Sequence, residues 1–187
     1  MKSNAEYLKE FRPAIRFVLV FVLIYVIGNV IYGIWVESFK PMPDPATRWA
    51  SEQSVVLINI FFDTVSTVVN ENSPNILITR NQKVILSVFE GCNGVNVMIV
   101  FVSFIVAFGG RLKATIVYLL TGILVLHIAN LIRLTLLYLT AIHQRPLFYY
   151  FHKYLFTAVL YAVVFLLWYI WIERLRRKLK TSDTVQA

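Results

Sequence analysis

Long apolar runs constrain this chain more than any other feature. The first, from Phe17 to Val36, holds 20 residues without a charge. As an α-helix it would extend about 30 Å, the thickness of the hydrocarbon core of a bilayer. Three more runs follow, at 94–110, 114–133 and 154–172. The chain is 58% hydrophobic, above the roughly 45–50% of soluble domains, so we expect an integral membrane protein with about four transmembrane helices.

The basic residues predict how these helices are oriented. The formal net charge is +8, and its carriers gather before the first run, in the short loop 111–113 and in the tail 173–187. Four spans would put all three groups on one side, which the positive-inside rule makes cytoplasmic. We therefore expect residues 1–16 and 173–187 in the cytoplasm and 37–93 outside. Basic residues at the ends of apolar runs favour lipid headgroups as partners, and not nucleic acid.

The outer segment 37–93 has its own pattern. Residues 54–69 are apolar but include Asn59 and Asp63, and we interpret them as an amphipathic or re-entrant helix on the outer side. Residues 75–89 are rich in β-branched side chains around a polar turn at 80–83, which predicts a short extracytoplasmic hairpin. The proline-rich stretch 40–45 is expected to be a loop. The predicted fold class is thus an all-α membrane domain with these two additions.

One cysteine, Cys92, carries the main chemical signal. It lies in the stretch Glu90-Gly91-Cys92-Asn93-Gly94, just before the second apolar run. The positive end of the following helix is expected to favour the thiolate and to lower the thiol pKa. A lone cysteine is also often only a small buried hydrophobic residue. The depth of Cys92 in the membrane helps to choose between these two interpretations.

Three helices are expected to bring Cys92, Arg133 and His152 to one level. They lie 19, 20 and 21 residues from the inner ends of their spans, roughly 30 Å each along a helix. That places a thiol, a cation and an imidazole at the outer membrane boundary. His152 could take the thiol proton, and Arg133 could stabilise an oxyanion. Snorkelling of Arg133 to headgroups and an interfacial role for His152 are the plainer alternatives.

Further polar residues are candidates to support this site. Asn130 lies three residues before Arg133 and therefore shares its helix face. It could hold Arg133, contact the substrate or only bond a neighbouring helix. Asn93 and Glu90, beside Cys92, are also expected to support it. His127 lies deeper and is expected to pack between helices. The histidines are too scattered to suggest a zinc site, and we expect no metal and no cofactor.

The chain resembles the exosortase/archaeosortase family of membrane transpeptidases. The resemblance rests on the stretch Glu90–Gly94, on Asn130 to Arg133 and on Tyr150-Phe151-His152, and it covers roughly residues 85 to 170. Many family members are longer, with about eight spans, and this chain looks like the small F-type branch. By this resemblance Cys92 is the nucleophile, Arg133 the electrostatic stabiliser and His152 the acid and base.

The resemblance implies a cysteine protease or transpeptidase in the bacterial inner membrane, with its active site facing outward. Its partners would be exported proteins with a C-terminal transmembrane sorting signal, passed to an envelope acceptor, and a companion membrane protein is possible. A non-enzymatic membrane assembly protein is the main alternative, and Cys92→Ser would discriminate between them. A small transporter is disfavoured because few polar residues lie near the midplane of the spans.

Overall fold

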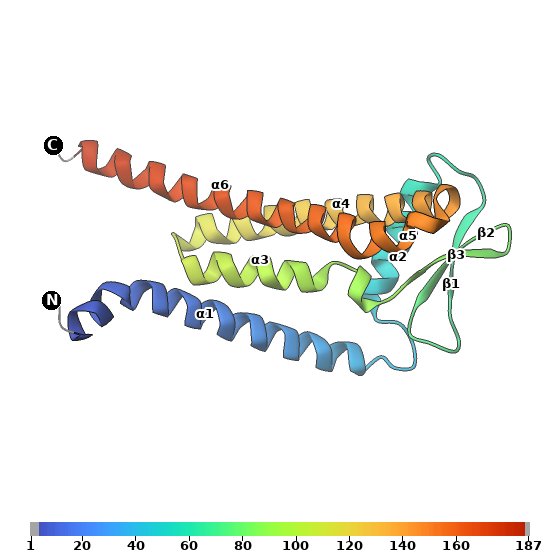
Figure 1. Cartoon of the computed structure of the whole chain (residues 1–187), viewed down its shortest axis with the longest axis horizontal. Coiled ribbons are helices and arrows are strands. Elements are labelled where there is room, and N and C mark those ends of the chain that lie inside the picture. Colours follow the sequence, from blue (N-terminus) through green and yellow to red (C-terminus); the bar gives the residue numbers. More distant parts are fainter. Residues whose placement is uncertain (1–3, 186–187) are drawn as a thin grey trace.

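The computed structural model describes the backbone of residues 4–185 and the side chains of 11–144 and 146–177. Its long helices run alongside one another, with a small sheet at one end and both termini near the other (Figure 1). The helices are α1 (Asn4–Glu37), α2 (Pro45–Ile58), α3 (Val95–Phe108), α4 (Leu112–His143), the one-turn α5 (Phe148–Tyr150) and α6 (Phe156–Val185). A 3₁₀ turn at Glu90–Cys92 precedes α3, and a π-helical turn at Phe151–Leu155 precedes α6.

Three helical stretches are long and apolar enough to cross a membrane, namely Phe11–Glu37, Leu112–His143 and Phe148–Arg177. This agrees with a membrane protein. The span predicted at 94–110 corresponds to α3, which has 14 residues and extends only about 21 Å. The span predicted at 114–133 lies inside the 32-residue α4. Arg133 therefore lies within that helix and not at its end.

Three antiparallel strands form the sheet, in the order β1 (Val65–Val69), β2 (Ile76–Arg80) and β3 (Lys83–Val88). The predicted hairpin over 75–89 is confirmed by β2 and β3. Its two-residue turn, Asn81-Gln82, has positive φ at both positions, as a type I′ hairpin turn requires. The prediction of an all-α fold is corrected, because β1 pairs with β2 and completes a sheet of its own.

The predicted helix 54–69 is wrong at both ends. Helix α2 begins earlier because Asp44 caps it, accepting a hydrogen bond from the Thr47 backbone N–H (2.9 Å), and Pro45 follows in the first turn. The expected loop 40–45 therefore ends in a helix start. Helix α2 ends at Ile58 because the Asn59 side chain bonds both backbone groups of Val65, at 3.0 and 3.2 Å. These two bonds turn the chain into β1.

Two apolar clusters hold the elements together. One joins the sheet, α2 and α4, and it contains Cys92. The other joins α3, α4 and α6, where the buried Tyr118 hydroxyl donates to the Leu167 carbonyl at 2.6 Å. Gly122 lets α4 approach α3, since a Cβ there would lie 2.2 Å from the Phe101 ring. The segment from β3 to α3 crosses from the first cluster to the second, and the candidate site lies along it.

Candidate active site

Cys92 lies in a tight connection between β3 and α3. Its backbone N–H donates to the Phe89 carbonyl at 2.8 Å and closes the 3₁₀ turn. Gly94 then adopts φ +85° before α3 begins, and a Cβ there would lie 3.0 Å from Asn130 Cγ. Both the left-handed conformation and the close approach require glycine. The close approach of Gly94 to Asn130 thus holds the nearby Cys92 against α4.

Asn93 ties the connection to two other helices. Its Oδ1 accepts from the Val95 backbone N–H (3.0 Å). Its Nδ2 donates to the Tyr32 hydroxyl (2.6 Å) in α1 and to Thr47 Oγ1 (3.0 Å) in α2. The side chain is 2% exposed. Asn93 therefore supports the site by holding the backbone around Cys92, and all three of its bonds are structural.

Glu90 is turned toward other neighbours. Its charge acts on Lys40, which is exposed near the end of α1, and on Tyr32 of that helix. Among the described residues its carboxylate has no hydrogen bond or ion pair. The structure does not bring Glu90 to the Cys92 thiol, so no contact among the described residues supports the role that we expected for it.

Asn130 connects Cys92 with Arg133. Its Nδ2 donates to the Cys92 carbonyl at 3.0 Å, and its Oδ1 accepts from an Arg133 terminal nitrogen at 3.3 Å. The residue is fully buried. Of the roles open for Asn130 from its spacing, holding Arg133 is the one that these contacts match. The bond to the Cys92 carbonyl was not foreseen.

Arg133 reaches the Cys92 thiol itself. The guanidinium lies close enough to the sulfur for its charge and its N–H groups to favour the thiolate. The thiol is only 3% exposed, and burial raises the Cys92 pKa more than Arg133 and a backbone hydrogen bond from Phe89 lower it. The expectation of a lowered pKa is therefore wrong. At neutral pH Cys92 is a thiol that needs a base before it can attack.

His152 also lies near Arg133. It belongs to the π-helical turn, and its ring stacks on Phe148 at 5.8 Å between centroids. The charge of Arg133 acts on His152 as well as on Cys92. No hydrogen bond joins His152 to Cys92 in the described part of the chain. Cys92 and His152 thus both lie near Arg133, and they do not form a direct cysteine–histidine pair among the described residues.

Two polar atoms of this group are buried without a partner, judged from the residues that the structure describes. They are Nδ1 of His152 and Nε of Arg133. Burying such atoms unbonded is costly, so each calls for an explanation such as a ligand or a catalytic role. A π-helical turn, as at His152, is also frequent at functional sites.

The sequence analysis missed the polar neighbours that α2 supplies. Thr47 bonds Asn93, and Gln53 Oε1 lies 2.6 Å from His127 Nε2 in α4. Trp49 stacks on the same imidazole at 4.5 Å. The expectation that His127 packs between helices is confirmed by these contacts. The stretch Asp44-Pro45-Ala46-Thr47 carries a helix-start signal that could have revealed the position of α2.

Comparison with known protein families, with curated proteins and with solved structures finds no match to this chain. The assignment of a function therefore depends on the residues and contacts described above.

Proposed function

We propose that this chain is a membrane-embedded cysteine peptidase or transpeptidase of the exosortase kind. The observation that carries the proposal is that the Arg133 guanidinium acts on the Cys92 thiol inside a buried polar group. Asn130 holds both partners, bonding the Cys92 carbonyl and Arg133. An arginine placed on a lone buried sulfur matches the order of residues on which the family resemblance rests.

The proposed chemistry begins with proton transfer from the Cys92 thiol to His152, whose Nδ1 is unpartnered among the described residues. The thiolate attacks a substrate carbonyl carbon, and Arg133 stabilises the negative oxygen that forms. The C–N bond then breaks, the leaving amine takes the proton from His152, and a thioester remains on Cys92. An acceptor amine or water attacks this thioester, releases the acyl group and returns the proton to sulfur.

The substrates of this proposal are exported proteins with a C-terminal sorting signal made of a short motif, an apolar helix and a basic cluster. A substrate helix lying along the bundle would present its outer end near the sheet, where the site lies. In this arrangement the protein sits in the bacterial plasma membrane with both termini cytoplasmic and the site facing outward. The basic start of α1 and the basic tail, at the end of the molecule opposite the sheet, support that orientation (Figure 1).

Intact-mass analysis of exported proteins from cells that express single variants tests the proposal. Cys92→Ala, Arg133→Gln and His152→Ala are expected to leave the C-terminal signal uncleaved, each at unchanged abundance of the membrane protein. His143→Ala is the matched control because His143 is exposed at the end of α4. Unchanged cleavage in Cys92→Ala would overturn the proposal.

A non-enzymatic membrane assembly protein is the second candidate, and the burial of Cys92 favours it. The thiol is enclosed by an apolar cluster, and Asn93 and Gly94 beside it make structural contacts. Cys92→Ser keeps the size of the side chain, so an assembly protein would tolerate it. An enzyme would lose a thioester intermediate that is detectable as an added acyl mass on wild-type Cys92.

A further inference from the structure

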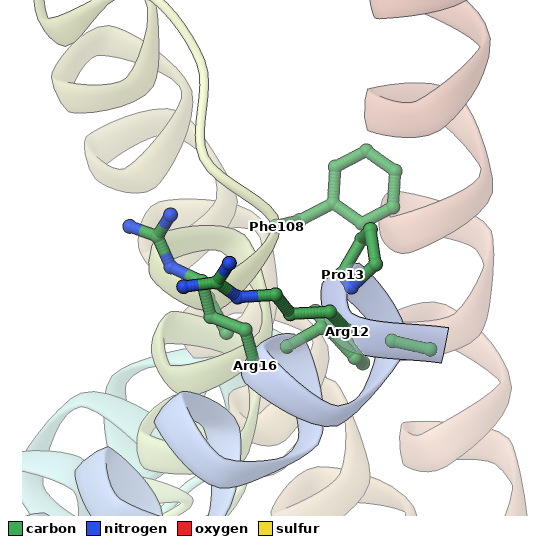
Figure 2. Close-up of a pocket in the computed structure, with 7 residues that line it drawn as sticks. Arg12, Pro13, Arg16 and Phe108 are labelled. Carbon is green, nitrogen blue, oxygen red and sulfur yellow. The ribbon is translucent and has the colours of Figure 1, made fainter. Parts of the chain in front are cut away.

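A hollow of about 850 Å³ lies at the end of the bundle opposite the sheet, between the start of α1 and the end of α3. Its lining combines two cations with apolar groups. The lining residues are Arg12, Pro13, Ala14, Arg16, Phe17, Ala107 and Phe108. In Figure 2 the two arginine side chains extend to the same side of the view, while the rings of Phe108 and Pro13 lie on the other. The hollow is thus cationic on one side and apolar on the other.

The two cations have no acidic partner among the side chains that the structure describes. Arg12 and Arg16 lie four residues apart on one helix face, where like charges repel each other. Neither has an acidic partner or a hydrogen bond among the residues that the structure describes, and both are exposed. Guanidinium groups bind phosphate in a bidentate manner and stay charged at every relevant pH. A phosphate between them would supply the missing charge.

The apolar side of the hollow continues along α1 and α3 as a wall of aromatic rings. The Phe17 ring meets the rings of Phe104 and Phe108 edge-on, at 5.4 and 6.1 Å between centroids. Arginines beside such a wall, at the end of apolar helices, match an amphiphile with an anionic head and a hydrocarbon tail. A free anion would use only the charged side of the hollow.

Helix α1 relies chiefly on one neighbouring helix to hold it in place, and such an amphiphile would add a further contact. It packs chiefly on α3, and its most apolar stretch is not buried within the protein. The two helices touch closely at Gly28, where a Cβ would lie 2.9 Å from the Ile99 side chain. At the hollow they are separated by aromatic rings, so a ligand there would hold the start of α1 on α3.

We propose that this hollow binds the phosphate headgroup of an anionic phospholipid. Arg12 and Arg16 hold the phosphate, and an acyl chain lies along Phe17 and Phe108. The bound lipid fastens the first half of α1 to the end of α3. This site is independent of the Cys92 group, which lies near the sheet, and its role is structural.

Native mass spectrometry of the full-length protein in detergent tests the site with defined lipids. Phosphatidylglycerol is expected to bind wild type at least tenfold more tightly than phosphatidylcholine, and Arg12→Gln/Arg16→Gln is expected to abolish that preference. Arg111→Gln/Lys113→Gln removes two exposed charges from the neighbouring start of α4 and is expected to keep the preference. Equal phosphatidylglycerol binding by wild type and the Arg12/Arg16 variant would overturn the proposal.

Two further measurements keep the test decisive. Inorganic phosphate that competes fully with the lipid at millimolar concentration would indicate a site for a free anion and overturn the lipid assignment. On wild type alone, the preference for phosphatidylglycerol is expected to disappear at 1 M salt, where screening extends to about 3 Å. A preference that persists at high salt would contradict the role of the two arginines, even if the variant does not fold.

Discussion

Replacing Gly94 by alanine tests how Asn130 positions Cys92. An alanine at φ +85° costs about 1–2 kcal/mol of backbone strain. Its Cβ would also lie 3.0 Å from Asn130 Cγ, and the fully buried Asn130 cannot move without losing its bond to the Cys92 carbonyl. Leaving such buried groups unbonded adds about 1–3 kcal/mol. We therefore expect Gly94→Ala to lower the free energy of unfolding by about 2–5 kcal/mol.

The assay is reversible unfolding in mixed detergent and SDS micelles, followed by tryptophan fluorescence. Gly33→Ala is the control, because Gly33 lies within α1 with open space around it. It is expected to be neutral or to stabilise by about 0.5–1 kcal/mol. In an Asn130→Ala background the nearest clashing atom, Asn130 Cγ, is gone. The loss of unfolding free energy caused by Gly94→Ala should therefore be smaller there by at least about 1 kcal/mol. An equal cost of Gly94→Ala in both backgrounds would refute the role assigned to this contact.

Four other predictions concern the thiol and two contacts between helices. Because burial raises the Cys92 pKa, alkylation of the native protein should reach half its maximal rate above the ~8.5 of a free thiol, and higher still in Arg133→Gln; a midpoint below 8 would contradict this. Because the thiol pKa is higher in the folded state, its contribution to the free energy of unfolding is fully present below the unfolded-state pKa and is lost as pH rises through the folded-state pKa. When unfolding is measured as a function of pH, Cys92→Ser should lack that loss. Tyr118→Phe, which removes a buried bond between α4 and α6, should cost about 0.5–1.5 kcal/mol in the same unfolding assay, and no cost would mean that the bond contributes nothing. A double-mutant cycle between His127 and Gln53 should give a coupling of about 0.5–1.5 kcal/mol, and zero coupling would contradict the docking of α2 on α4 through this bond.

The long helices were predictable because lipid demands a minimum length of uncharged helix. The hairpin was predictable for a local reason as well, since β-branched residues flank a polar turn at 80–83. Both features are written in consecutive residues, and the structure has both. Counting residues along helices of constant rise predicted a common depth for Cys92 and Arg133, but it could not predict that the two side chains approach each other laterally.

Other features depend on contacts that are distant in sequence. Residues 54–69 are largely apolar, and their division into helix and strand depends on the Asn59 side chain bonding the Val65 backbone. The bonds of Asn93 join partners 61 and 46 residues away. The direction of the Cys92 pKa depends on burial, which the residues around it do not reveal.

The π-helical turn at Phe151–Leu155 makes chain length as important as side-chain identity at this site. Each residue of an α-helix advances the rotation about the helix axis by 100°. A π-helical turn accommodates one extra residue, and the helix that follows is not rotated by it. Removing one residue there would let α6 keep its packing while His152 swung about a quarter-turn away from Arg133. A chain of this fold with one residue fewer before α6 would therefore have to carry its imidazole at a neighbouring position to keep the same arrangement.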